Sequence, residues 1–341
     1  MNKYNVNIKD NQKSLLIRSA TIQDATRLTN WWNDGSVMAH AGFPNGLNQS
    51  IEQTIEQIQL NETRPSQLCI IEKDGLCIGE LSFRISDDVA EIGIKICESS
   101  FQNQGLGTIL LQQLITFLFE NRKIEKIILD TNLKNLRAQR VYENIGFKKL
   151  AVHVDADKDQ LGALQSYVDY ELSRAQFENG IRLITDTSFK QAIATSILAD
   201  LPEWFGLPDS TTEYIQQSMN MPFFATFRNN KPVGFIVLKE TSKFTAEIYV
   251  MGILKDFHRQ QIGEQLFYKF VQFAQNSGYE YLQVKTVDEG HYAEYDRTRL
   301  FYEKMNFRKL ECFPDMWDKN NPCLIMVQSV DSAMKHFNNQ L

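Results

Sequence analysis

The sequence lacks any long hydrophobic run. No apolar stretch approaches the roughly 18 residues that a membrane-spanning helix needs. The polar start, MNKYNVNIKDNQKS, has no hydrophobic region of the kind found in secretory signals. We therefore expect a cytoplasmic protein that does not have a membrane as a partner.

Cysteine and histidine are scarce as well, with five of each among the 341 residues. The cysteines are scattered, mostly within strand-like segments, and the histidines do not cluster with them. This pattern is typical of buried thiols in a reducing compartment and indicates neither a disulfide framework nor a metal site. The cysteines are Cys69, Cys77, Cys97, Cys312 and Cys323.

Positive charge is not in excess, because 36 lysines and arginines stand against 42 aspartates and glutamates, which gives a net charge of −6. Nucleic acid is therefore not an expected partner, whereas a cationic amine would be attracted by such a field. The composition, 43% hydrophobic and 23% charged residues, is that of a globular protein with an ample core. The length suggests two domains.

One stretch, EIGIKICESSFQNQGLGT from Glu91 to Thr108, combines a strand, a polar turn and the start of a helix. Isoleucines alternate with Gly93 and Lys95 at strand spacing, and leucines recur at helical spacing after Gly107. The first N–H groups of a helix have no intrahelical partner, and glycine lets the chain approach a bulky anion. The stretch therefore predicts a diphosphate site, although a plain strand–helix turn has the same pattern.

A second copy of this stretch begins at Glu247 and reads EIYVMGILKDFHRQQIGE. Glu247 precedes Gly263 by sixteen residues, as Glu91 precedes Gly107, and RVYENIGF at 140–147 recurs as LFYEKMNF at 300–307. A duplication with so long a period indicates two tandem copies of one domain. We expect the domains at 1–175 and 180–341, with the polar segment 173–180 as the linker.

The order of the expected elements is the same in both copies, and strands and helices intermix without strict alternation. This favours an α+β fold in which each domain has a mixed, mostly antiparallel sheet flanked by helices. The first domain is expected to have strands at 14–21, 67–73, 76–86, 91–96, 126–131, 148–155 and 166–173 and helices at 22–34, 50–61, 105–118 and 135–144. The second is expected to have strands at 181–186 and 280–287, a hairpin turning at 229–230, a central strand that begins at 247, helices at 189–200, 211–219, 261–276 and 297–305, and two final strands.

These motifs resemble the GNAT superfamily of N-acetyltransferases. The order Gln102-x-x-Gly105-x-Gly107 is similar to its pyrophosphate loop, and Asn135-x-x-Ala138-x-x-x-Tyr142-Glu143 is similar to its N-x-x-A-x-x-x-Y-E signature. The opening WWNDGSVM resembles the RimJ/RimL branch, and the second domain resembles a divergent group of bacterial GNAT proteins. The resemblance covers about 14–173 and 180–330. It implies an enzyme that transfers acetyl from acetyl-CoA to a primary amine, of a small cationic molecule or a peptide N-terminus, by direct attack on the thioester.

The same resemblance implies roles for four side chains. Glu91 and Glu247 match a glutamate that serves as general base, and Tyr142 and Tyr302 match a tyrosine that protonates the departing sulfur. Each has an ordinary alternative, because a strand glutamate can be an ion-pair partner and a helix tyrosine can be core packing. For Asn135, the alternative to a contact with the cofactor is a helix N-cap.

The cofactor contacts that the resemblance implies lie at the end of each central strand and in each loop. In the first domain they are Ile96, Cys97, Glu98, Gln102, Asn103, Gln104, Gly105, Leu106, Gly107, Thr108 and Asn135. In the second they are Ile253, Leu254, His258, Arg259, Gln260, Gln261, Ile262 and Gly263. The second loop departs from the pattern, because Gln261 replaces the first glycine and the anionic Glu264 follows the second. We therefore expect diphosphate binding chiefly in the first domain.

The acceptor site is expected in the segments that the two copies share least. These are 31–48, with Trp31, Trp32, His40 and Phe43, and 155–165 in the first domain. In the second domain they are 201–212 and 288–296, where His291 and Tyr292 lie among acidic residues. Tryptophans near a helix end are also typical of plain packing, and the acidic loop could be simply solvated.

Two other functions are compatible with the sequence. One is a non-catalytic acyl-CoA-binding or regulatory protein. The other is a tandem-GNAT aminoacyl transferase that uses charged tRNA, which the intact Gly105/Gly107 loop and the negative charge argue against. The acceptor, the length of the acyl group, the number of active domains and the oligomeric state do not follow from the sequence.

Overall fold

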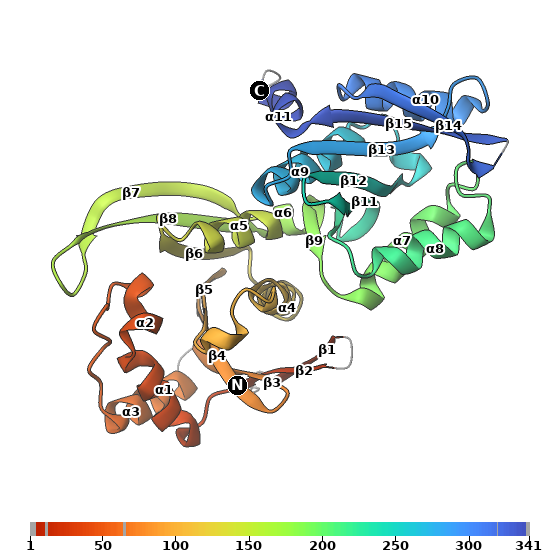
Figure 1. Ribbon diagram of the computed structural model, residues 1–341. Helices are drawn as coiled ribbons and strands as arrows, with labels where there is room; N and C mark the ends of the chain where they lie inside the picture. The colour runs from red at the N-terminus through yellow and green to blue at the C-terminus, as the bar shows by residue number, and fades with distance from the viewer. Residues whose placement is uncertain (1–4, 11–12, 64–65, 319, 339–341) are drawn as a thin grey trace. The chain divides into compact units, whose positions relative to one another are not determined.

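The computed structural model describes residues 5–10, 13–63, 66–318 and 320–338 (Figure 1). The chain divides between Gln176 and Phe177 into two compact units, the N-terminal unit and the C-terminal unit. Each unit has one sheet and its own helices, which is the expected mixed, mostly antiparallel α+β architecture. No helix in the described ranges is both long and apolar enough to cross a bilayer.

The N-terminal sheet has eight strands in the order β1-β2-β3-β4-β5-β6-β8-β7. Every neighbouring pair is antiparallel except β5 and β6. The strands are β1 (Asn5–Asp10), β2 (Lys13–Ser19), β3 (Ser66–Lys73), β4 (Leu76–Ser86), β5 (Val89–Ile96), β6 (Lys126–Asn132), β7 (Lys148–Lys158) and β8 (Leu164–Ser173).

The parallel strands β5 and β6 separate after three residue pairs. Val89, Ala90 and Glu91 lie opposite Lys126, Ile127 and Ile128, and the pairing stops there. Beyond this point β5 stays paired with β4 as far as Ile96, and β6 stays paired with β8 as far as Asn132. The sheet therefore opens into a wedge, in which no strand of the described residues pairs with the edge of β5 from 92 to 96.

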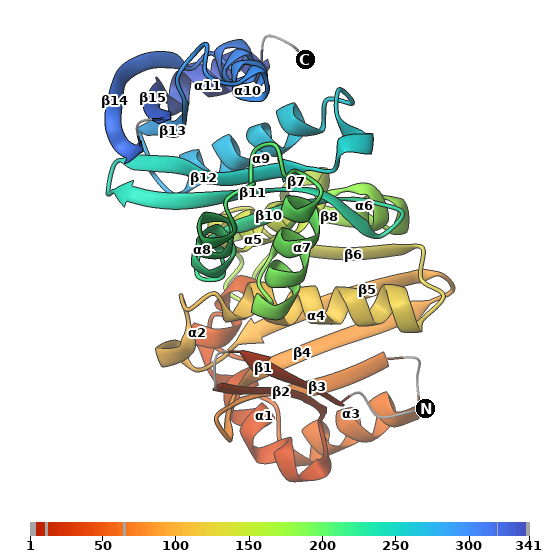
Figure 2. The same ribbon diagram turned by 90° about the vertical axis from the view of Figure 1, so that its right-hand side faces the viewer.

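Helices cover both faces of the N-terminal sheet (Figures 1 and 2). One face carries α1 (Ala25–Asn33), α2 (Gly35–Met38) and α3 (Ile51–Thr63), and Leu28, Trp32 and Ile58 pack there with Ile70 of β3. The other face carries α4 (Leu106–Asn121) and α5 (Leu136–Ile145). There Phe83 of β4 lies 6.5 Å from Phe117 of α4, measured between ring centroids. Short 3-10 turns lie at Ile22–Asp24 (η1), Ala39–Ala41 (η2) and Ser99–Phe101 (η3).

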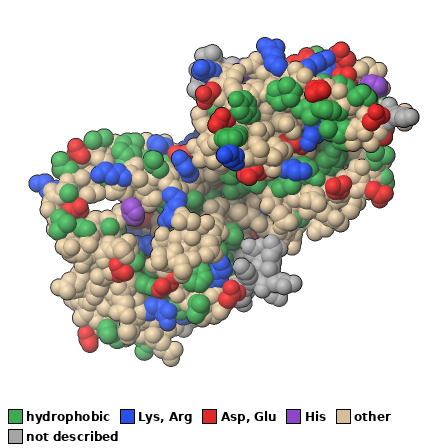
Figure 3. All heavy atoms as spheres, viewed as in Figure 1, with side chains coloured by type: hydrophobic (Ala, Val, Ile, Leu, Met, Phe, Trp, Pro, Cys, Tyr) green, Lys and Arg blue, Asp and Glu red, His purple; other side chains and the backbone are tan. Residues whose placement is uncertain are grey.

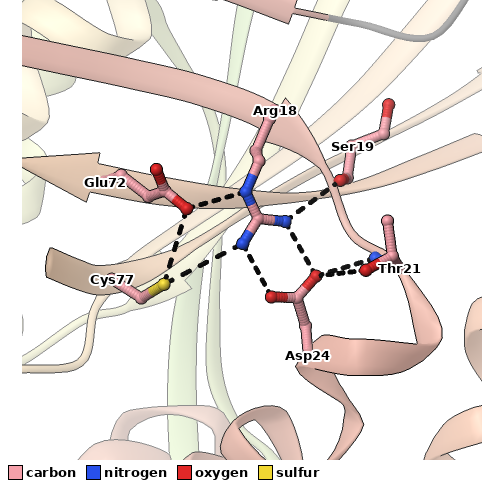
Figure 4. Close-up of polar contacts among 6 residues, drawn as sticks. All are labelled: Arg18, Ser19, Thr21, Asp24, Glu72 and Cys77. Carbon is pink, nitrogen blue, oxygen red and sulfur yellow. Dashed lines mark hydrogen bonds and ion pairs between the residues drawn. The ribbon is translucent and has the colours of Figure 1, made fainter. Parts of the chain in front are cut away.

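Arg18 anchors the first helical segment to the sheet (Figure 4). Its guanidinium donates to both carboxylate oxygens of Asp24, at 2.7 and 2.8 Å, and to Glu72 of β3 at 2.7 Å. Asp24 also accepts from the backbone and the hydroxyl of Thr21, so it caps η1 while it neutralises the arginine. Burial by itself would raise the pKa of Asp24, but these hydrogen bonds outweigh it and hold the pKa below its usual value.

The C-terminal sheet has seven strands in the order β14-β15-β13-β12-β11-β10-β9, and only β12 and β13 are parallel. They too separate, after the pair Ile248–Val284. The strands are β9 (Ile181–Ile184), β10 (Phe223–Arg228), β11 (Lys231–Ser242), β12 (Thr245–Ile253), β13 (Tyr281–Val287), β14 (Arg308–Asp318) and β15 (Asn321–Ser329). The helices are α7 (Thr187–Ala199), α8 (Pro208–Ser218), α9 (Ile262–Asn276), α10 (Ala293–Lys304) and α11 (Val330–Asn338), and Lys255–Phe257 forms the turn η4.

The central strands of the two sheets, β5 and β12, differ in one detail. Val237 pairs with Val250 while Leu238 pairs with Ile248, so Tyr249 is an extra residue that forms a β-bulge in β12. The pairing of β5 with β4 runs without interruption. On each side of the C-terminal sheet there is an apolar core, one beneath α9, α10 and α11 and the other beneath α7.

Some expected boundaries were wrong. The segment expected as a linker contains a helix, α6 (Arg174–Asn179), because Ser173 and Gln176 cap each other and Arg174 binds the carbonyls of Phe119 and Ile124. Helix α10 begins at Ala293, inside the segment expected as a polar loop. Strand β1 and helix α11 were not expected. The turns at Asp74-Gly75 and Asn229-Asn230 have the positive φ angles that such hairpins need.

Candidate active site

The turn between β5 and α4 has the backbone geometry of an anion site. Asn103 and Gly105 are both left-handed, with φ of 61° and 75°, and Gly105 is the N-cap of α4. The N–H groups of 103–107 make no hydrogen bond with any described residue. A Cβ at Gly105 or Gly107 would meet nothing within 4 Å, so the space in front of these amides is open. An open cradle of unpaired amides at a helix N-terminus fits a diphosphate.

Side chains of the turn hold its shape. Gln102 donates to the carbonyl of Ile96 at 2.9 Å, and Gln104 donates to that of Ser100 at 2.8 Å. Leu106 is buried and anchors the helix start in the core. These contacts explain the conformation of the loop, whereas a cofactor contact by Gln102, Asn103, Gln104 or Thr108 stays a prediction.

Two cations beside this turn were not found from the sequence. Lys73, at the end of β3, donates to the side-chain oxygen of Gln104 at 2.8 Å. Arg137, in the first turn of α5, donates to that of Asn103, also at 2.8 Å. Both add positive charge at the predicted anion site. No sequence signal identifies them, because each comes from a different element and is brought to the loop by the fold.

Part of the backbone after β5 is already hydrogen-bonded within the protein. The N–H groups of Cys97 and Glu98 both donate to the carbonyl of Ile78, at 2.9 and 3.0 Å. Glu98 also accepts from the indole of Trp31, and Trp32 donates to the buried Glu80. The edge of β5 along the wedge, short of the Ile96 carbonyl that Gln102 binds, is the backbone left for an extended ligand. Asn135 is the N-cap of α5 and accepts from the N–H of Ala138 at 3.2 Å.

Tyr142 of α5 lies on the same face of the sheet as α4. Its ring is buried and meets Tyr170 edge-on, with the centroids 5.6 Å apart. No hydrogen bond joins its hydroxyl to a described residue. Burial, with the nearby charge of Asp130, raises the pKa of Tyr142 to about 12, so the hydroxyl keeps its proton at neutral pH.

Glu91 lies on the opposite face, at the point where β5 and β6 separate. It is exposed and forms an ion pair with Arg84. The ion pair is the structural role given above as the alternative for Glu91. Its role as general base stays a prediction.

The C-terminal loop repeats the backbone of the N-terminal one. Arg259 and Gln261 are left-handed, with φ of 60° and 61°, like Asn103 and Gly105. His258 contacts the carbonyl of Ile253 at 2.7 Å, and Gln260 donates to that of Asp256 at 3.0 Å, as Gln102 and Gln104 do in the first copy.

The space beside Gly263 in the second loop, however, is occupied. A Cβ on Gly263 would lie 3.2 Å from the ring of Phe301 and 3.3 Å from the methyl group of Met251. Glu264 adds a negative charge in the first turn of α9, where it forms an ion pair with Lys304. Both features oppose a diphosphate at this loop.

Two further candidates of the C-terminal unit are buried. Glu247 accepts from Gln283 at 2.7 Å and from Lys285 at 2.8 Å. Tyr302 lies in the core, and burial raises its pKa. The backbone N–H of Leu254 is bonded to the carbonyl of Val233, and Ile262 is buried.

The segments expected to form the acceptor site of the N-terminal unit do meet. Gln160, in the turn between β7 and β8, bonds through its N–H to the carbonyl of Gly42 and through its side chain to Asn45 and Gly46, each at 2.9 Å. In the C-terminal unit Trp204 is bonded to Tyr295 and Thr298 of α10. The acidic residues near His291 are largely neutralised, since Glu289 binds Lys309 at 2.7 Å and Glu294 binds Arg297 at 3.2 Å.

Comparison with known proteins identifies the class of enzyme that this fold and loop define. Residues 14–148 match the profile described as an acetyltransferase (GNAT) domain, and residues 191–307 match that of the acetyltransferase (GNAT) family. The two matches cover well over half of the chain. The chain therefore belongs to the GNAT acetyltransferases, with two such domains in tandem, and it is an N-acetyltransferase. GNAT acetyltransferases use acetyl-CoA.

The relatives act on different amines, according to their names. An aminoglycoside N(6')-acetyltransferase type 1 of Klebsiella pneumoniae is 21% identical over 187 residues, which cover 51% of this chain and 92% of that protein. Spermidine N-acetyltransferase from Vibrio cholerae, solved with CoA and spermine, has a TM-score of 0.45 at 19% identity and covers 48% of this chain and 98% of its own. The ribosomal L7/L12 α-N-protein acetyltransferase RimL, solved with coenzyme A, has a TM-score of 0.41 at 20% identity, with coverages of 47% and 93%.

Proposed function

We propose that the N-terminal unit transfers the acetyl group of acetyl-CoA to a primary amine, and that the C-terminal unit does not bind this donor. The observation that carries the proposal is the open turn at Gly105 and Gly107, at the end of a wedge in the sheet, where five N–H groups have no hydrogen-bond partner among the described residues. At the corresponding place in the C-terminal unit, Phe301 and Met251 occupy the space in front of Gly263.

Each part of the N-terminal site has a separate task. The amides of 103–107, assisted by Lys73 and Arg137, hold the diphosphate, and the free edge of β5 aligns the extended arm by backbone hydrogen bonds. Acetyl-CoA supplies an activated carbonyl carbon and a thiolate leaving group. Tyr142 keeps its proton at neutral pH and donates it to the departing sulfur.

A pair of matched substitutions tests this assignment. Tyr142→Phe removes the acid without creating a cavity, and we expect the rate of thiol release to fall by about 10²-fold or more. Tyr302→Phe makes the same change in the C-terminal unit and should leave the rate within about twofold of wild type. The assay follows CoA thiol release spectrophotometrically over a panel of polyamines, aminoglycosides, amino acids and peptides.

Measuring CoA affinity together with thiol release distinguishes an acetyltransferase from a protein that only binds acyl-CoA. Tyr142→Phe should bind CoA as wild type does, because the hydroxyl serves the sulfur and not the diphosphate. Equal turnover in both variants and in wild type would reject Tyr142 as the acid. CoA binding by wild type without thiol release from any acceptor would instead favour a non-catalytic acyl-CoA-binding protein.

A further inference from the structure

The β7–β8 hairpin of the N-terminal unit is joined through Gln160 to the loop after α2. The N–H of Gln160 donates to the carbonyl of Gly42 at 2.9 Å. Its side chain accepts from the N–H of Asn45 and donates to the carbonyl of Gly46, both at 2.9 Å. One residue in the turn of the hairpin therefore makes three hydrogen bonds to a segment that is distant in sequence.

The turn of the hairpin is held in shape by Asp159. Its carboxylate accepts from the N–H groups of Leu161 and Ala163, both at 2.9 Å. It also accepts from the side-chain nitrogen of Gln165 at 2.9 Å, and the side-chain oxygen of Gln165 accepts from Asn132 at 2.8 Å. Asn132 is the last residue of β6, which borders the wedge, so these contacts fix the turn to the sheet.

The loop after α2 is held in shape by the end of α1. Asn33 donates to the carbonyl of Gln49 at 2.8 Å and accepts from its N–H at 2.7 Å. A Cβ on Gly46 would lie 2.2 Å from the carbonyl oxygen of Asn33, and one on Gly35 would lie 1.9 Å from that of Pro44. The backbones are thus in direct contact, and we expect the loop, like the turn, to move as a unit.

The joint between these two units is weaker than either of them. Gln160 and Asn45 are exposed, so water competes for their hydrogen bonds. The apolar side chains of Phe43 and Leu161 stay 38% and 66% exposed, so they gain little when the joint is closed. Local opening draws on contacts of this kind, which are exposed and bury little apolar surface.

The joint closes a ring beside the wedge. The ring runs from the end of β6 along the hairpin to Gln160, crosses to the segment 42–46, and returns through η2, which lies against β6. The space-filling view shows an opening between the hairpin and α2 (Figure 3). An acceptor that approaches the wedge from the face carrying α1 to α3 therefore has to pass through the ring, unless the ring opens.

We propose that Gln160 is the latch of this ring and determines how bulky an acceptor the N-terminal unit can use. With the latch closed, a slender acceptor reaches the thioester through the opening, whereas a bulky one enters only while the latch is open. The inference rests on the proposed function and adds control of acceptor access to it. For a bulky acceptor, kcat/KM is then proportional to the fraction of molecules whose latch is open.

Hydrogen exchange at the amide of residue 160 measures that fraction in the full chain without any acceptor. Gln160→Ala removes the two side-chain bonds, while the amide keeps its bond to Gly42, so its exchange still reports opening of the ring. The exchange rate should rise by about tenfold. The turn amides bound to Asp159 should exchange as in wild type. Gln57→Ala, which replaces an exposed glutamine of α3, is the matched control and should equal wild type throughout.

The kinetic test uses acceptors that present the same amine in two sizes. One pair is a linear peptide and the same peptide at the N-terminus of folded ubiquitin. The other is 6-amino-6-deoxyglucose and kanamycin A, which contains that sugar. For the larger member, Gln160→Ala should raise kcat/KM by the same factor, about tenfold, by which it raises the exchange rate, and the smaller member should stay within about twofold. CoA affinity should not change, because other contacts hold the loop at Gly105.

Equal exchange at residue 160 in Gln160→Ala and in wild type would overturn the inference, because the side-chain bonds would then not hold the ring closed. So would a kcat/KM for the larger member that does not rise, or an equal change for both members, which is the result expected of a residue that only stabilises the loop. If wild type releases no thiol with any of the four acceptors, the proposed function fails and the control of access fails with it, whereas the exchange rates still show whether Gln160 holds the ring.

Discussion

Gln261 occupies a backbone conformation that favours glycine. Its φ of 61° lies in the left-handed region, as that of Gly105 does at the corresponding place. A residue with a Cβ is strained there by about 1 kcal/mol or more. The C-terminal loop thus keeps the shape of an anion site although Phe301 covers it. The loop has this conformation with glutamine at the position, because the side chains of His258 and Gln260 hold the turn.

Gln261→Gly should therefore stabilise the C-terminal unit. Glycine relieves the strain of the folded loop, but it also increases the entropy of the unfolded chain. The net gain in the free energy of unfolding should be about 0.5–1 kcal/mol. The matched change Gly105→Ala should cost about 1 kcal/mol in the N-terminal unit. Equilibrium unfolding in urea measures both, and a Gln261→Gly protein less stable than wild type would contradict the argument.

At the scale of elements, polar contacts add to the apolar packing that holds the N-terminal helices on the sheet. Arg18 of β2 joins Asp24 of η1 to Glu72 of β3, and the indoles of Trp31 and Trp32 in α1 donate to Glu98 and Glu80. Apolar periodicity predicts that α1 forms. It does not predict the polar contacts that fix α1 to the sheet, since these join side chains distant in sequence.

Asp24→Asn should destabilise the N-terminal unit by about 2 kcal/mol, because it leaves Arg18 without its bidentate partner. The folded-state pKa of Asp24 is lowered, so its contribution is present above the unfolded pKa of about 4 and is lost as the pH falls through the lower folded value. Wild type should therefore lose more stability than Asp24→Asn between pH 5 and pH 2. Urea unfolding across this range tests the difference, with Asp88→Asn as the exposed control.

At the scale of the whole chain, duplication has produced two units with the same sheet order around the wedge and unequal loops. The N-terminal loop is open and has cations beside it, whereas the C-terminal loop is covered by Phe301 and Met251 and has Glu264 in its first turn. A fold can keep its core while a site decays, since core packing and loop contacts depend on different residues.

Calorimetric titration with CoA should accordingly give one site per chain. Gly107→Ala is the informative variant, because its methyl group would enter open space and would not strain the fold. It should instead obstruct the diphosphate and weaken binding by about tenfold or more. Two equivalent sites per chain, or a Gly107→Ala protein that binds CoA as wild type does, would contradict the assignment to the N-terminal loop.

The sequence by itself determined the duplication, the order of the elements and the position of the two loops. These are properties of local spacing, which repeats from Glu91 to Gly107 and from Glu247 to Gly263. The mixed sheet could be predicted from this spacing. The helix at 174–179 could not, because it is stabilised by contacts of Arg174 with the carbonyls of 119 and 124, which are distant in sequence.

Only the tertiary structure decided which residues surround the loops. Lys73 of β3 and Arg137 of α5 are distant in sequence from Gln104 and Asn103, and the fold brings them to these loop residues. The same holds for Phe301, which closes the second loop, whereas Val141 stands at the matching place in the first copy, where the loop is open. A shift of one residue in register would turn each strand side chain to the other face. Local pattern therefore locates the loops, and long-range pairing decides the chemistry around them.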